Sequence, residues 1–321
     1  MEYVLRKCAA KLVLFVIVCS SSALAQTKHE FHQTFAVSIA EPVRLRVELL
    51  QGDTEIAYSR EGEVTVSASQ VSDGNASAGV LANVVSVTAD GNPIEIRQNQ
   101  AVDTSASAAK IAYRIDVPYR TEVFLAVKSG KQTITGIMGP VSAEVNEGDI
   151  RVSYVSKAVL AHAERGNLDL QVIGEHIEAM VERGSISCSR AAQGVRAEAW
   201  DGNISLMRVG PSQVRVRHGA GKIDVAGVSG TLIASTDAGS LHVRAVPHDD
   251  WQLSSESGEI GIELPAGLGF DLDAMTNSGE VVVARDDFNT PSATVRQLNQ
   301  KVNAGGRRIE VRSKSGRIAV S

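Results

Sequence analysis

The 321-residue sequence has few aromatic residues, few cysteines and no long apolar run. Only 4% of its residues are aromatic, which argues against a globular core built around large ring side chains. The hydrophobic fraction of 43% is high enough for a packed core, so wholesale disorder is excluded. A mature membrane span needs about 20 consecutive apolar residues, and no such stretch is present.

The start of the chain has the pattern of a secretory signal peptide. Three basic residues precede the apolar run 12–18, and Ala23 and Ala25 are small residues of the kind that signal peptidase requires. We therefore expect residues 1–25 to be removed and the mature protein to be exported to the periplasm, the cell surface or the medium. Cys19 offers lipidation as a minor alternative.

The cysteine count and the net charge argue against a disulfide-stabilised protein and against a nucleic-acid-binding protein. Once the signal peptide is removed, Cys188 is the one cysteine left, so no internal disulfide can form even in an oxidising compartment. The net charge of −5 is unfavourable for contact with nucleic acid, because the phosphate backbone attracts basic surfaces. We predict a protein that binds no nucleic acid and is stabilised by packing and backbone pairing.

Glycine, in contrast, is abundant and regularly spaced. Successive turn glycines are 18, 18, 18, 18, 19, 18, 19, 21 and 37 residues apart. They are Gly130, Gly148, Gly166, Gly184, Gly202, Gly221, Gly239, Gly258, Gly279 and Gly316. A period of this length is typical of a repeat architecture.

Alternating apolar and polar residues flank each of these glycines. The positions seven and five before the glycine, and two and four after it, are apolar throughout, apart from Gln132. Period-two alternation predicts strands, and the glycine then forms the turn because it adopts positive φ without penalty. The predicted fold is all-β, a single-stranded β-solenoid with about 18-residue coils and two short strands per coil. An ordinary β-sandwich is the weaker alternative, because it does not keep matched columns at a fixed spacing.

The regular pattern does not cover the whole chain. Residues 26–122 predict an irregular N-terminal β region that leads into the solenoid, and residues 123–321 predict the regular solenoid. An insertion at 285–306 interrupts the alternation before RRIEVRSKSGRIAVS resumes it. Because that last stretch reads as a full strand with nothing after it, we expect an uncapped C-terminal coil. Such a coil predicts a homo-oligomer formed by end-to-end pairing, or a cap borrowed from the insertion.

Several stretches resemble a known bacterial family. They are FAVSIAEPVRLRVELLQGDTEI, IAYRIDVPYRTEVFLAVKSGKQTITGI, the serial steps EGDI, DGNI and SGEI, and the closing RRIEVRSKSGRIAV. In these the chain resembles the "putative adhesin" domain-of-unknown-function family, over essentially the whole mature chain. The resemblance implies an exported β-solenoid in or outside the envelope.

No catalytic, cofactor or metal site is expected from the residue pattern. His29 and His32 have an H-x-x-H spacing but lack an acidic partner at a fixed distance. Cys188 falls in an apolar column and reads as a small buried hydrophobe, and His218 marks a widened coil. The turn residues vary too much for a calcium ladder, and the Gly267-Leu268-Gly269 sequence precedes no helix that could hold a nucleotide.

The best candidates for a surface contact are Glu164, Glu182 and Trp200. The two glutamates stack one coil apart, and Trp200 is one of the few aromatic side chains predicted to face outward. Solvated charges that contribute at most about 1 kcal/mol are the simpler interpretation of the glutamates. We expect a non-enzymatic, adhesin-like structural or binding module of the cell envelope, whose partner is an envelope protein or a glycan. The alternative is a polysaccharide-binding or polysaccharide-cleaving β-helix protein.

Overall fold

The computed structural model describes residues 26–38, 41–59, 62–73, 85–89, 91–99, 111–211, 213–284 and 295–321. This part of the chain is all-β, with no helix among the described residues, and divides into two compact units, residues 1–141 and 142–321. The predicted signal peptide, residues 1–25, lies outside the described residues, as does the stretch 285–294 of the predicted insertion.

The first unit combines parallel and antiparallel pairing. Its strands are β1 (Gln26–Ala36), β2 (Val43–Gln51), β3 (Asp53–Tyr58), β4 (Glu63–Asp73), β5 (Val85–Thr88), β6 (Ile94–Gln98), β7 (Ile111–Val117), β8 (Thr121–Ser129) and β9 (Gln132–Thr135). β2 and β3 flank Gly52 and pair in parallel with β8 and β9, which flank Gly130. On their other side, β2 and β3 pair with β6 and β7. Antiparallel strands follow, because β5 pairs with β6, and β4 pairs with both β7 and β1.

The second unit is the β-solenoid that the glycine spacing predicts, which confirms the fold class. Each coil has two arms around one central glycine, after which we name it. The strands are β10 (Val141–Glu147, beginning at the last residue of the first unit), β11 (Ile150–Val155), β12 (Val159–Arg165), β13 (Leu168–Ile173), β14 (Ile177–Arg183), β15 (Ile186–Ala191), β16 (Val195–Val209), β17 (Val214–Val228), β18 (Leu232–Arg244), β19 (Trp251–Ser257), β20 (Ile260–Glu263), β21 (Phe270–Thr276), β22 (Val281–Val283), β23 (Gln297–Val302), β24 (Arg307–Ser315) and β25 (Ile318–Val320).

Neighbouring coils pair in parallel with equivalent residues side by side. Ala161 lies opposite Ala179, which in turn lies opposite Ala197, so each column of the sequence becomes a column in space. These three alanines have no solvent exposure, and the aliphatic residues two and four after each turn glycine are at most 2% exposed, apart from the half-buried Val283. The narrow interior is therefore filled by Val, Ile, Leu and Ala, and large aromatic side chains are rarely needed.

The turn glycines fall into two geometric classes. Eight of the ten have positive φ, between 120° and 144°; Gly184, for example, has φ of 140°. Gly279 and Gly316 are not among the residues with positive φ, so another reason requires glycine there. A Cβ atom on Gly316 would lie 1.9 Å from the carbonyl oxygen of Gly258, and one on Gly279 would lie 1.9 Å from that of Gly316. The close approach of neighbouring backbones therefore excludes a side chain at both positions, as it also does at Gly184, where a Cβ atom would lie 1.9 Å from the carbonyl oxygen of Gly166.

A second backbone feature repeats six residues after the glycine. Tyr154, Val172, Arg190 and Arg208 all have φ between 56° and 58°, the left-handed region that side-chain-bearing residues rarely adopt. The parallel ladder skips this position, since Ser153 pairs with Gln171 and the next pair is Val155 with Ile173. Each of these four coils therefore contains a bulge, after which the next side chain again points inward.

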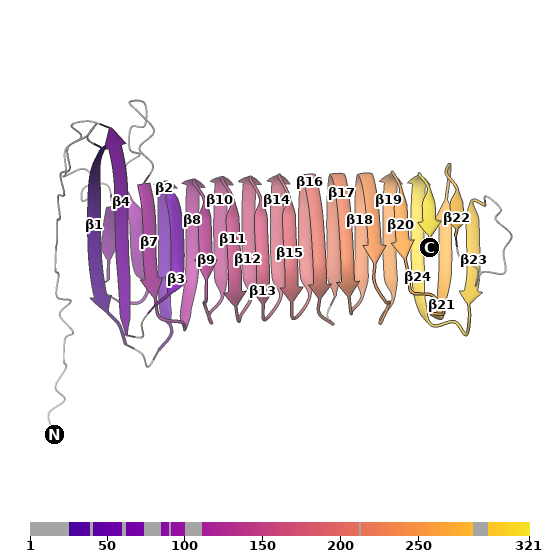
Figure 1. The fold of residues 1–321 in the computed structure, drawn as a ribbon, viewed down its shortest axis with the longest axis horizontal. Helices are drawn as coiled ribbons and strands as arrows, with labels where there is room; N and C mark the ends of the chain where they lie inside the picture. Colours follow the sequence, from indigo (N-terminus) through magenta and orange to yellow (C-terminus); the bar gives the residue numbers. More distant parts are fainter. Residues whose placement is uncertain are drawn as a thin grey trace, which may run out of the picture. The chain divides into compact units, whose positions relative to one another are not determined.

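The expectation of an uncapped C-terminal coil is wrong. β24 pairs in parallel with β19 on one edge and with β21 on the other, and β25 likewise lies between β20 and β22. The Gly316 coil is therefore inserted between the Gly258 and Gly279 coils, out of sequence order. Figure 1 shows the yellow β24 between the orange β19 and β20 and the strands β21 and β22. Both edges of the final coil are therefore occupied.

The Gly279 coil, not the Gly316 coil, is the last in space, and part of the insertion covers it. β23 runs antiparallel to β21, from Phe270 opposite Val302 to Met275 opposite Gln297. Leu298 and Val302 of β23 point inward, whereas Asn299 and Lys301 are exposed. A short strand with polar and charged residues is a common protection for a sheet edge, so β23 acts as a cap.

Candidate functional site

The outward face of the second unit carries two columns of exposed or half-exposed side chains on the arm before each glycine. One column lies four residues before the glycine, and the other lies two residues before it. These positions face water because they alternate with the buried columns on the same strands. Across four coils the two columns bring together side chains that are 18 or more residues apart in sequence.

A shallow hollow of about 310 Å³ lies between these columns. It extends over strands β12, β14, β16 and β17. Its lining residues are His162, Met180, Val181, Glu182, Glu198, Ala199, Trp200 and Arg217. The lining combines apolar groups with two carboxylates, a guanidinium and an imidazole, and ligand sites also mix apolar and polar groups.

Trp200 is the most exposed large apolar side chain of the hollow. Its relative exposure is 65%, which is unusual for a residue with so large an apolar surface. The corresponding position of the next coil is Gly219, which has no side chain to cover the indole. The sequence therefore leaves one face of the ring open to solvent or to a ligand.

The polar groups of the rim differ in how they are engaged. Glu198 accepts hydrogen bonds from Arg196 at 2.9 and 3.0 Å, and this carboxylate raises the pKa of the Arg196 guanidinium. The side chains of Glu182 and Arg217 form no hydrogen bond or ion pair with the described residues. Their side chains are exposed, so they are free to exchange water for the polar groups of a ligand.

The structure brings two of the three predicted contact residues into one site. Glu182 and Trp200 both line the hollow, whereas Glu164 does not. Glu164 instead accepts a hydrogen bond from Asn146 Nδ2 at 2.7 Å. His162, Met180, Glu198 and Arg217 were not anticipated. All four lie four residues before a turn glycine, so the sequence places them in one outward column. That column forms a continuous surface only when four coils are stacked.

The other residues considered in the sequence analysis are buried or hydrogen-bonded within the fold, as far as the structure describes them. Cys188 is buried, and burial, followed by the charge of Asp169, raises the pKa of its thiol to about 12. His218 is also buried, and its Nε2 donates to the carbonyl oxygen of Gly202 at 2.9 Å. Within the described ranges, no group of three or more His, Cys, Asp and Glu side chains is placed to hold a metal ion. The side chain of His29 lies outside the described residues, and His32 forms a hydrogen bond with Ser67 Oγ.

Comparison with known proteins identifies a family. The sequence model of the family described as Toastrack DUF4097 matches residues 157–321. No curated protein matches the chain. In the described part of the chain, no helix is long and apolar enough to cross a membrane.

The solved structures that are similar to the chain include the following two, both at low identity. One is described as a "putative cell adhesion protein" from Clostridium sporogenes, with 11% identity, 90% of this chain and 97% of that chain covered, and a TM-score of 0.23. The other is described as a "putative adhesin" from Bacteroides fragilis, with 11% identity, 91% and 97% covered, and a TM-score of 0.35.

Proposed function

Because the chain belongs to the Toastrack DUF4097 family, whose model matches residues 157–321, we propose that it is a non-enzymatic binding module of the bacterial cell envelope. In this proposal the protein is exported, acts in an adhesin-like manner, and uses the hollow around Trp200 to contact a glycan. The observation that carries the proposal is the open indole of Trp200 in a hollow with unengaged polar groups.

The chemistry of the hollow suits a sugar ring. The flat face of an indole packs against the C–H face of a pyranose, and this removes apolar surface of both partners from water. Glu182 and Glu198 accept hydrogen bonds from hydroxyl groups, and Arg217 donates to ring or hydroxyl oxygens. A volume of about 310 Å³ is at the lower end for ligand sites, so we expect one sugar unit of a longer chain to be held.

The charges of the hollow favour a neutral sugar over a polyanion. Glu182 and Glu198 are acidic, while Arg217 is the one permanently cationic side chain of the lining. The whole chain is also acidic, with a net charge of −5. An acidic polysaccharide would be repelled at long range, whereas a neutral one would not.

The absence of turnover is part of the proposal. Glycoside hydrolysis needs a carboxylic acid and a second carboxylate on opposite sides of the scissile bond, in a site from which bulk water is excluded. Glu182 and Glu198 lie in a shallow hollow on one strand face, and Arg196 already holds Glu198. This arrangement supports binding better than bond cleavage.

The test is a binding screen of the mature chain against an array of neutral and acidic glycans, followed by titration calorimetry with the best neutral ligand. Trp200→Ala should weaken binding by about tenfold or more, because stacking and apolar burial are both lost. Glu182→Gln and Arg217→Gln should weaken it less. Met207→Ala is the matched control, since Met207 is an exposed residue of the same coil that does not line the hollow.

Three results would overturn the proposal. They are failure to bind any glycan, unchanged affinity of the Trp200→Ala variant, and release of reducing ends when the chain is incubated with the bound glycan. The last result would instead favour the polysaccharide-cleaving alternative.

A further inference from the structure

The inserted position of the Gly316 coil creates a slot with two walls. The Gly258 coil forms one wall through β19 and β20, and the Gly279 coil forms the other through β21 and β22. Both walls come from residues 251–283, which precede the inserted coil in sequence. The slot and its occupant are therefore separate stretches of chain, joined by residues 284–306.

The occupant is held on both edges by backbone hydrogen bonds. On one edge Gly258 N donates to Ser315 O at 3.1 Å, and on the other Ile318 N donates to Glu280 O at 2.8 Å. The side chains of Ile309, Val311, Ile318 and Val320 are at most 1% exposed in the slot. The Gly316 coil thus makes the contacts of an ordinary interior coil, although it arrives from a distant part of the sequence.

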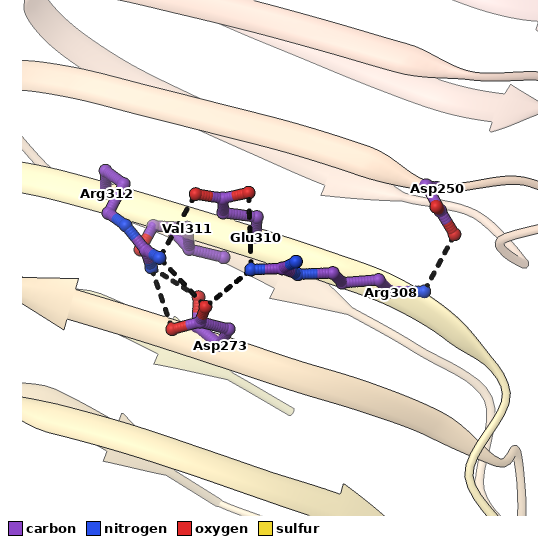
Figure 2. Close-up of polar contacts among 6 residues, drawn as sticks. All are labelled: Asp250, Asp273, Arg308, Glu310, Val311 and Arg312. Atoms are coloured by element: carbon purple, nitrogen blue, oxygen red, sulfur yellow. Dashed lines mark hydrogen bonds and ion pairs between the residues drawn. The ribbon is translucent and has the colours of Figure 1, made fainter.

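A charge network makes the slot specific for this coil. Arg308 and Arg312 of β24 donate to the Asp273 carboxylate of β21 at 2.9 and 2.8 Å. Glu310, between them on β24, forms an ion pair with Arg312 at 3.1 Å. Figure 2 shows both guanidinium groups converging on Asp273. Only 16% of the Asp273 side chain is exposed, so an unmatched charge here would be costly.

On the side of the first wall, one further contact fixes the start of β24. The backbone N–H of Arg308 donates to Asp250 Oδ1 at 2.9 Å (Figure 2). Asp250 immediately precedes β19, so the entering chain is tied to the Gly258 coil as well as to Asp273. The occupant is therefore recognised at its first residues and along its length.

The chain enters the slot at a close backbone crossing. A Cβ atom on Gly269 would lie 2.5 Å from the carbonyl oxygen of Gly305, and one on Gly306 would lie 2.5 Å from that of Gly269. Gly305 has φ of 75°, a conformation that glycine adopts without strain. Two glycines at the point of entry allow the chain direction to change there, as hinge segments require.

We propose that residues 307–321 are exchanged between two copies of this chain, each copy donating its coil to the slot of the other. Every contact of the slot recurs in the exchanged form, so the dimer loses no pairing, and the main opposing term is the entropy of association. This association differs from end-to-end pairing, because it uses the occupied slot and needs no free edge. It is also independent of the proposed glycan contact.

The experiment uses two full-length variants with reversed charge. Asp273→Arg alters the slot, and the double variant Arg308→Asp/Arg312→Asp alters the coil. Within either variant the slot and coil repel each other. In a dimer of one copy of each, both exchanged pairs are again of opposite charge. The two variants are unfolded in urea, mixed, refolded together, and examined by size-exclusion chromatography with light scattering.

The expected result is a one-to-one heterodimer whose yield is about tenfold above the dimer yield of either variant refolded alone. The heterodimer should form even if each variant alone fails to fold, since both of its slots are matched. A mixture with no more dimer than the separate variants overturns the proposal. Replacing Asp273→Arg by Asp273→Asn is the control. Only the repulsion within the double variant is then relieved in the mixed dimer, so the excess of heterodimer should be smaller.

A second measurement needs no variant. The unaltered chain is refolded at rising protein concentration and then diluted. The proposal expects a dimer fraction that rises with the refolding concentration and that dissociates slowly after dilution, because the coil must leave the slot. A strictly monomeric product at every concentration counts against it.

Discussion

Gly202 and Gly184 are so close in successive coils that a Cβ atom on Gly202 would lie 1.8 Å from the carbonyl oxygen of Gly184. Gly202 also has φ of 143°. Gly202→Ala should therefore lower the free energy of unfolding by about 3 kcal/mol or more, since neither the contact nor the backbone conformation tolerates a side chain. Urea unfolding followed by circular dichroism measures the change.

A matched glycine provides the control for that prediction. A Cβ atom on Gly261 would meet nothing closer than His242 Nδ1 at 3.8 Å, an ordinary contact distance. Gly261→Ala should change stability by less than about 1 kcal/mol. Equal destabilisation by the two substitutions would show that stacking distance is not the reason for glycine at the turn.

The left-handed bulge position gives a prediction of the opposite sign. Val172 has φ of 56°, and a β-branched residue is particularly unfavourable there. Val172→Asn should raise the free energy of unfolding by about 0.5–1 kcal/mol, because Asn tolerates this conformation. The control is Gln171→Asn at the preceding residue, which is not among the residues with positive φ and should give no gain. Thermal unfolding of the three proteins decides the outcome.

The buried thiol predicts a dependence of stability on alkaline pH. Burial, with a smaller effect of Asp169, raises the pKa of Cys188 from 9.0 to about 12 in the folded chain. The unfolded chain therefore loses the proton first, so the stabilising contribution of Cys188 is complete below pH 9 and declines between pH 9 and 12. Cys188→Ala should show a shallower loss of stability over that window. Identical slopes for the two proteins in urea unfolding at about pH 8 to 10.5 would contradict the assignment.

Asp273 predicts a complementary dependence at acidic pH. The hydrogen bond from Arg312 is the main reason why the pKa of Asp273 is lowered, and Arg308 adds to it. The stabilisation is present above the unfolded pKa, about 4, and is lost as the pH falls through the lower folded value.

Asp273→Asn should accordingly cost about 1–3 kcal/mol at pH 7 and lose less stability than the unaltered chain on acidification. Glu256→Gln is a suitable control, because Glu256 forms an exposed pair with Lys314 and should cost little. Parallel unfolding curves at pH 7 and pH 3 measure both effects. The same acid sensitivity in Asp273→Asn as in the unaltered chain would show that another carboxylate is responsible.

The coil pattern was predictable because it depends on local chemistry. Each glycine is flanked by columns whose polarity follows from facing the interior or water, so the spacing alone places Ala161 and Ala179 on one inward column, where they lie opposite each other. The bulge was not predictable, because Tyr154, Val172 and Arg190 are ordinary strand residues whose positive φ results from closing the coil.

The order of the last two coils was not predictable either. The alternation around Gly316 is that of any other coil, so nothing in it indicates that β24 lies between β19 and β21. The reason for glycine in the Gly267-Leu268-Gly269 sequence could not be predicted either. Gly269 lies where the link after β20 crosses Gly305 and Gly306, a contact between residues more than 30 positions apart. The hollow could not be predicted for the same reason. Trp200 and Arg217 line it from neighbouring coils, so their proximity depends on how the coils stack.

The inserted coil also affects the order in which the chain is completed on the ribosome. From the Gly166 coil to the Gly258 coil, each coil pairs with the one synthesised just before it, for example β18 with β17. The Gly279 coil is different, since its parallel partners β24 and β25 are synthesised after it. Until those residues emerge, β19 and β20 present an open edge, and a long sequence separation must then be closed. Pauses in translation before residue 307 should therefore expose this edge to other chains.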